Sequence, residues 1–387
     1  MKRVLFLFNH DAAHQVAHLA GIAAACAREC DKVQTVVAYA TPAIRAQLDG
    51  LIAPADAKRI RWVELALEGG ALRVAKVFDK VLPASRLLRL KRHADLFAEM
   101  DMIVSTERTC LRLKKQIDPA DMPLFGYIPH GSGDRSVAYH PDIRRFDQVF
   151  VSGQKVVDQL VAHGVEAERI AIVGYPKFEA IDLSSKPDFF GNGRPTFVYN
   201  PHFDPHLSSW YDAGPDLLRW FASEAGQQFN CIFAPHVMLF RKRMHISPEF
   251  KVARRRPEIP AEALAADNIL IDTDSPRLFD MSYMLAADAY IGDVSSQMYE
   301  FLARRRAAFY LDCRSSPDAK DADWHMFWKS GPRVSSVGEL VQLLPHWQEI
   351  AAQYRPAQDE LLDYTFNITD QPASSRTAQV IADLMAN

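Results

Sequence analysis

Short runs of apolar residues alternate along the chain with longer segments in which apolar positions recur at helical spacing. In the first half we expect strands at residues 4–8, 33–38, 59–64, 102–105, 124–128, 148–152 and 170–173. Helical patterns cover residues 12–30 and 72–100 and a segment that ends at residue 163. Strands that alternate with helices predict an α/β architecture with parallel sheets.

Residues 184–195 (SSKPDFFGNGRP) interrupt this pattern, because they are rich in Ser, Pro and Gly and have no periodicity. The alternation then restarts, with strands at 196–200, 231–234, 269–272, 289–292 and 308–311 and helices near 215–225, 276–286, 296–304 and 375–385.

We therefore expect two Rossmann-like, doubly wound domains, 1–183 and 196–372, joined by the linker 184–195. A helix in 373–387 is expected to pack back on the N-terminal domain. Two such domains that face each other leave a cleft at the carboxyl ends of their strands, where open α/β sheets bind ligands.

The composition excludes several classes of protein. Of 387 residues, 48% are apolar and 24% are charged, as in a globular protein with a large core. The 45 Lys and Arg against 48 Asp and Glu give a net charge of -3, so we expect no nucleic-acid partner. The five cysteines form no CxxC pair, which disfavours a zinc ribbon or a disulfide scaffold.

No run of about 20 apolar residues exists to span a membrane. The N-terminal apolar run is too short for a signal peptide and predicts a first strand, so we expect a cytoplasmic protein. Attachment to the inner face of a membrane stays open. Basic residues at 241–243, 251 and 254–256 could face an anionic substrate or such a surface, or form a solvated loop.

Candidate chemistry follows the predicted strands. After the strand at 124–128, His130 stands beside Gly131, with Asp134 and Arg135 close by in sequence. A histidine there can take a proton from an acceptor hydroxyl, since its pKa is ordinarily near neutrality. The alternative is a histidine that only caps a turn. Tyr175, in a Gly-Tyr-Pro turn, is equally a ligand contact or part of a plain strand-to-helix turn.

Two more strands of the second half end in polar loops. Asn200 and His202 belong to the first, together with Asp204 and His206. The two histidines and the aspartate could bind a metal, but the prolines around them do not suit a metal-binding helix, so we expect no metal. His236 follows the strand at 231–234 and could hydrogen-bond a phosphate or diphosphate.

The segment after the strand at 289–292 is the most specific. Asp293 precedes Ser295 and Ser296, which we expect to open a helix, and Glu300 lies one to two turns into it. Free N–H groups at a helix start bind phosphate. The alternative is an ordinary serine cap. No GxGxxG follows the first strand, and neither GxxxxGK[ST] nor GxSxG occurs, which disfavours dehydrogenases, P-loop NTPases and α/β-hydrolases.

Residues 288–301 (DAYIGDVSSQMYEF) resemble the strand–Asp–x–Ser–Ser–helix signature of the CDP-glycerol glycerophosphotransferases of the teichoic acid polymerase type. The resemblance spans residues 120–312 and implies the GT-B fold. It implies that His130 is the catalytic histidine of a His-Gly motif and that His236 is a second important histidine beside the donor diphosphate. It also places the donor-phosphate serines on Ser295 and Ser296.

The chain departs from this family at His130–Arg135 (HGSGDR), where the family has a His-Gly-Thr-Pro-like run. It departs again at Asn200–Asp204, which lacks the arginine of the family's Thr-Trp-Arg segment. A fainter similarity to UDP-N-acetylglucosamine 2-epimerases, which share the fold, is present near residue 133.

Three hypotheses follow. The first is a transferase that moves a glycerophosphate, polyol-phosphate or sugar unit from a nucleotide-activated donor to a hydroxyl acceptor, which could be lipid-linked. The second is an epimerase that acts on UDP-N-acetylglucosamine. The third is a non-catalytic nucleotide-sugar-binding protein. None of them calls for a cofactor.

Overall fold

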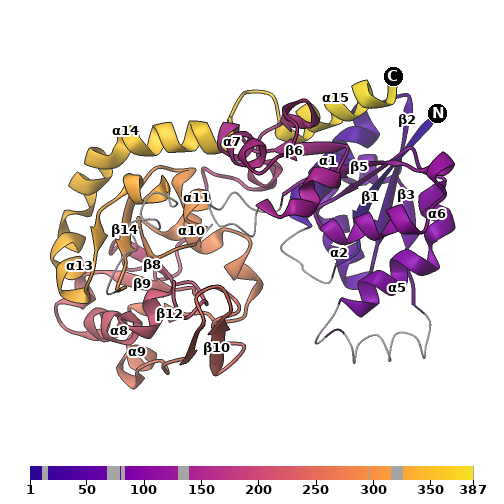
Figure 1. Cartoon of the computed structure of the whole chain (residues 1–387). Coiled ribbons are helices and arrows are strands. Elements are labelled where there is room, and N and C mark those ends of the chain that lie inside the picture. The colour runs from indigo at the N-terminus through magenta and orange to yellow at the C-terminus, as the bar shows by residue number, and fades with distance from the viewer. Residues whose placement is uncertain are drawn as a thin grey trace. The chain divides into compact units, whose positions relative to one another are not determined.

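A computed structural model describes residues 1–10, 16–67, 79, 83–129, 139–295, 297–314 and 326–386. The chain divides into two compact units (Figure 1). The second unit contains Ile181–Leu362, and Asp363–Asn387 return to the first unit. His130, Gly131, Asp134, Arg135 and Ser296 lie outside the described residues.

The first unit is built on a parallel sheet. Among its described residues, seven strands pair in the order β3-β2-β1-β4-β5-β6-β7. The central strands are buried on both faces and are therefore almost wholly apolar, as in all-parallel sheets. The strands are β1 (Lys2–Phe8), β2 (Val33–Tyr39), β3 (Arg61–Glu64), β4 (Met102–Ser105), β5 (Leu124–Tyr127), β6 (Gln148–Val151) and β7 (Ile170–Ile172).

Helices cover both faces of this sheet. Helix α1 (Ala17–Glu29) is rich in alanine, a strong helix former. It packs against the C-terminal helix α15 (Ala373–Ala386), whose Ile381 is fully buried in the same core (Figure 1). The other helices of this unit are α2 (Pro42–Leu51), α3 (Pro54–Ala57), α5 (Ala84–Arg92), α6 (Ala94–Ala98) and α7 (Gln154–Ala162).

The second unit repeats this plan. Its described strands form a six-stranded parallel sheet in the order β12-β9-β8-β13-β14-β15. Both sheets therefore have the doubly wound order, which reverses between β1 and β4 in the first unit and between β8 and β13 in the second. The strands are β8 (Thr196–Asn200), β9 (Asn230–Phe233), β12 (Ile269–Ile271), β13 (Ala289–Gly292), β14 (Ala307–Leu311) and β15 (Arg333–Val334).

Around this second sheet lie helices and a separate two-stranded hairpin. The hairpin pairs β10 (Met244–Ser247) with β11 (Val252–Arg255) in antiparallel register. The helices are α8 (Gly214–Ala222), α9 (Ala261–Ala265), α10 (Ser282–Ala286), α11 (Gln297–Leu302), α13 (Val337–Leu343) and α14 (Trp347–Phe366). Among the described helices, none is both long enough and apolar enough to cross a membrane.

The α/β class with parallel sheets is confirmed, but one expected helix is wrong. The sequence predicts a single helix over 276–286. The structure instead has the short 3-10 helix η10 (Pro276–Leu278) and, after a break, α10. At the break Met281 adopts a left-handed conformation with φ 65, which an α-helix cannot contain.

Candidate functional site

The loops that follow β8, β9 and β13 meet at one edge of the second sheet. These strands are neighbours and run parallel, so their carboxyl ends open on the same edge. The strand order reverses there between β8 and β13, and ligands of doubly wound sheets bind at such a point. The predicted site residues that the structure brings to this edge are Asn200, His202, His236, Asp293 and Ser295.

Asp293 ties the loop after β13 to the loop after β8. Its Oδ1 accepts from the backbone N–H of His202 at 2.8 Å. Its Oδ2 accepts from the backbone N–H of Ser209 at 2.6 Å and from the Ser209 hydroxyl at 2.7 Å. Burial outweighs these hydrogen bonds and raises the pKa of Asp293 to about 7. Both carboxylate oxygens thus hold the 202–209 loop in place.

Asn200 joins the same loops from the end of β8. Its amide nitrogen donates to the carbonyl of Ala234 at 2.6 Å and to Oε1 of Gln297 at 2.7 Å. Its Oδ1 accepts from the hydroxyls of Ser295 at 3.2 Å and Tyr290 at 3.3 Å. A fully buried amide with these partners fixes the ends of β8, β9 and β13 against one another.

Ser295 lies two residues before Gln297, the first residue of α11. Its Oγ accepts from the backbone N–H of Gln297 at 3.3 Å and donates to Asn200. These bonds tie Ser295 to the start of α11 and to the end of β8. A contact between Ser295 and a donor phosphate stays a prediction.

His202 and His236 lie side by side, one from each of two adjacent loops. Their ring centroids are 5.2 Å apart, and Phe203 packs against both rings. In each ring Nδ1 faces a backbone N–H, that of Asp204 at 3.0 Å and that of Met238 at 3.2 Å. Since Nδ1 therefore accepts, the neutral imidazole carries its proton on Nε2.

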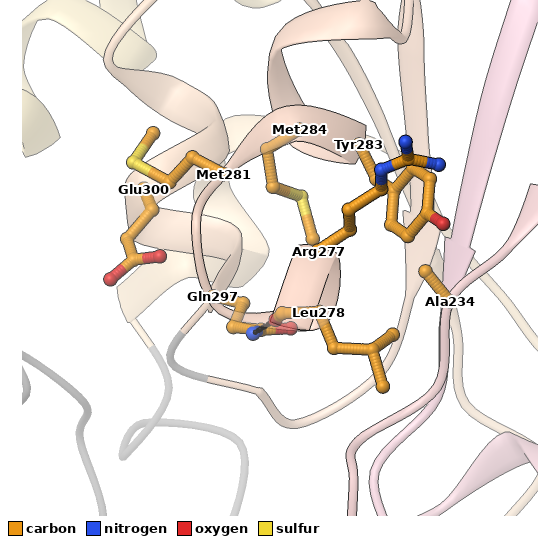
Figure 2. Close-up of a pocket in the computed structure, with 8 residues that line it drawn as sticks. All are labelled: Ala234, Arg277, Leu278, Met281, Tyr283, Met284, Gln297 and Glu300. Atoms are coloured by element: carbon orange, nitrogen blue, oxygen red, sulfur yellow. Dashed lines mark hydrogen bonds between the residues drawn. The ribbon is translucent and has the colours of Figure 1, made fainter. Parts of the chain in front are cut away.

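A small hollow that is open to solvent lies beside these loops in the second unit. Figure 2 shows its lining, with the carboxylate of Glu300 at one end of the view and the phenol of Tyr283 and the guanidinium of Arg277 at the other. Apolar side chains lie between these ends. The lining residues are Ala234, Arg277, Leu278, Met281, Tyr283, Met284, Gln297 and Glu300.

Most of this lining was missed by the sequence analysis, which singled out Glu300 alone. Tyr283 is held in place by its hydroxyl, which donates to Oδ2 of Asp272 at 2.7 Å. Burial would raise the pKa of Asp272, but hydrogen bonds from Ser275 and Tyr283 outweigh it and lower that pKa. Asp272 follows directly after β12. Its position at a strand end is the feature of the sequence that could have marked it as a candidate site residue.

In the first unit, Tyr175 follows β7 and is buried. It packs against the rings of His18, Phe178 and Phe366 at centroid distances of 4.9 to 5.3 Å. It also lines a second, mainly apolar hollow at the ends of β5, β6 and β7. The structure therefore places Tyr175 in a different unit from the residues around Asp293.

Within the part of the chain that the structure describes, no group of three or more His, Cys, Asp or Glu side chains could hold a metal ion. Asp204 uses its Oδ1 to accept from the backbone N–H of His206 at 2.9 Å, which shapes the loop.

No family model and no curated protein matches this chain. Solved structures do match over the whole chain. S. aureus MnaA with UDP is 10% identical with a TM-score of 0.59, over 100% of this chain and 97% of that chain. The wall teichoic acid polymerase TagF is 14% identical with a TM-score of 0.61, over 100% and 88%. A UDP-N-acetylglucosamine 2-epimerase is 11% identical with a TM-score of 0.60, over 100% and 97%.

The chain has the GT-B fold. This confirms the fold that the Asp293–Phe301 resemblance implies. The matched structures include both a teichoic acid polymerase and UDP-N-acetylglucosamine 2-epimerases, so the fold agrees with both resemblances and selects neither family.

Proposed function

We propose that this chain is a transferase that moves a glycerophosphate, polyol-phosphate or sugar unit from a nucleotide-activated donor to a hydroxyl acceptor. The observation that carries the proposal is the hollow with the buried carboxylate of Glu300, beside the switch-point loops of the second sheet. Among the matched structures, one of TagF was soaked with CDPG and that of MnaA is a co-structure with UDP, which supports a nucleotide ligand.

The hollow has the chemistry to hold a nucleoside. The carboxylate of Glu300 would accept hydrogen bonds from ribose hydroxyls, which are donors. At the other end, the exposed guanidinium of Arg277 offers fixed positive charge and several donors to a base or a phosphate. Met281, Tyr283 and Met284 would cover an apolar ring face.

The histidine pair would bind the diphosphate. The Nε2–H groups of His202 and His236 are donors on adjacent loops, and phosphate oxygens are acceptors. Charge that grows on the departing phosphate during transfer would be stabilised by these donors, which Asp293 and Asn200 position. His236 thus keeps the donor-phosphate role that the resemblance implies, and His202 joins it.

The reaction balances without a further reagent. The acceptor hydroxyl loses its proton to a base, the role that the resemblance gives to His130, and its oxygen attacks the transferred group. For a glycerophosphate unit, a phosphorus–oxygen bond forms and a nucleoside monophosphate leaves. For a sugar unit, a bond to the anomeric carbon forms and a nucleoside diphosphate leaves.

A thermal-shift screen tests the proposal. We expect a CDP-, UDP-, GDP- or CMP-linked compound to raise the melting temperature, since a ligand that binds only the folded form stabilises it. Glu300→Gln should abolish the shift, while Glu262→Gln, the same change on an exposed side chain of α9, should keep it. Donor binding is contradicted if no compound of the panel raises the melting temperature.

The epimerase hypothesis is the second candidate, because UDP-N-acetylglucosamine 2-epimerases are among the matched structures. Incubation with UDP-N-acetylglucosamine and no acceptor separates the two. Conversion without an acceptor favours the epimerase, and product that forms only with an acceptor favours the transferase. Binding of the nucleotide with no product in either case favours a non-catalytic binding protein.

A further inference from the structure

One face of the hairpin β10–β11 is exposed. The register pairs Met244 with Arg255 and Ile246 with Ala253. Directly paired residues of antiparallel strands project to the same face, so these four side chains share one face of the hairpin. All four are exposed, and the exposed fractions of Met244 and Ile246 are 53% and 69%.

Exposed cations surround this apolar pair. Arg241, Lys242 and Arg243 directly precede β10, and Lys251 lies in the turn that leads into β11. With Arg255 on the face itself, these make five exposed basic side chains within fifteen residues. Glu249 is the one carboxylate in the same stretch, so the surface is strongly positive although the chain as a whole carries -3.

The opposite face anchors the hairpin to the second unit. Arg254 donates to both carboxylate oxygens of Asp212 at 2.7 Å and lies over the ring of Tyr211. The ring of His245 is buried, with Nε2 3.0 Å from the carbonyl of Leu239. The hairpin is therefore held on its inner side and presents the outer side as a fixed platform.

We propose that this outer face, defined by Met244, Ile246, Arg255 and the cations Arg241–Arg243 and Lys251, docks on an anionic lipid surface. Basic side chains are attracted to anionic head groups, and apolar side chains at the same level enter the boundary with the acyl chains. A membrane accommodates both features of the face, and the docking does not depend on which donor or acceptor the chain uses.

Two other occupants fit the face less well. A second copy of the chain that met the face with the same face would place like charges opposite one another. A soluble polyanion such as a nucleic acid would use the cations but would leave Ile246 in water. The apolar pair therefore favours lipid over both.

Co-sedimentation with vesicles tests the proposal on the full chain. We expect binding to vesicles that contain phosphatidylglycerol and weak binding to vesicles of pure phosphatidylcholine. Added salt should reduce the binding, because it screens the electrostatic attraction. Each cation near an anionic surface contributes about fivefold in affinity, so the triple change of Arg241, Lys242 and Arg243 to Gln should weaken binding about 100-fold. A triple change of the exposed Lys32, Lys58 and Lys115 to Gln is the charge-matched control and should bind as the parent does.

Ile246→Ser separates lipid from the other occupants. Its side chain is exposed, so the change should leave folding intact while it weakens vesicle binding about tenfold. Binding of soluble heparin should not change. The proposal is overturned if binding ignores phosphatidylglycerol, if the control triple loses as much as the hairpin triple, or if Ile246→Ser leaves vesicle binding intact. It is also overturned if sedimentation shows a dimer that Ile246→Ser dissociates.

Discussion

Replacing Asp293 with asparagine tests whether a buried carboxyl group organises the candidate site. Its two oxygens accept three hydrogen bonds from His202 and Ser209. An asparagine side chain keeps one oxygen but carries two N–H donors where the protonated carboxyl group carries one O–H, so at least one more buried donor faces another donor. An unsatisfied buried donor costs about 1–3 kcal/mol. We expect Asp293→Asn to lower the free energy of unfolding of the second unit by this amount at about pH 5.

The raised pKa of Asp293 sets the direction in which the free energy of unfolding changes with pH. The pKa of Asp293 is raised from 3.8 to about 7, so the folded chain keeps a proton that the unfolded chain loses at lower pH. Stability from this group is present below the unfolded pKa and is lost as the pH rises toward 7. Linkage gives a loss of about 2 kcal/mol between about pH 5 and pH 7, with little more above pH 8.

Asparagine does not titrate, so the cost of Asp293→Asn should shrink by about 2 kcal/mol over that range. Urea unfolding at several pH values measures it, with the fluorescence of Trp210, which is buried next to Ser209, as one reporter. Asp267→Asn, the same change on an exposed side chain of this unit, is the control and should cost little at any pH. A cost that instead grows from pH 5 to pH 7 would refute the reasoning, because it would mean that the fold favours the charged form.

Three further outcomes are expected. His236→Ala should weaken binding of a nucleoside diphosphate, measured by calorimetry, about 5- to 50-fold, and should weaken binding of the bare nucleoside far less, because it removes a donor to the diphosphate. Gly153→Ala should destabilise the first unit by more than about 2 kcal/mol in thermal unfolding, since its new Cβ would lie 2.6 Å from the Thr365 backbone. Gly50→Ala, where a Cβ meets nothing within 4 Å, should not lower the melting temperature, and a loss there would contradict the packing argument.

Much of the fold could be predicted because buried parallel strands are continuous apolar runs. The strand expected at 289–292 is β13, with the same bounds, and the strand expected at 102–105 is β4. Helix α14 was missed because Pro356 lies inside it, and proline ordinarily ends a helix. The hairpin β10–β11 was missed because Met244 and Ile246 face outward, so no buried face marks it in the sequence.

The candidate site could be predicted only in part. Polar residues after parallel strands meet at one edge for topological reasons, so the sequence could bring Asn200 and Asp293 to the same place. It could not give the bond between Asn200 and Gln297, which are 97 residues apart. Nor could the sequence predict the hollow, because its wall depends on the interruption between η10 and α10 at Met281.

A crystal structure of the chain with a bound nucleoside diphosphate tests the central claim most directly. The account predicts that the nucleoside occupies the hollow of the second unit, with ribose hydroxyls on Glu300 and phosphate oxygens on the histidine pair. A nucleotide bound elsewhere on the chain, with that hollow unoccupied, would contradict it.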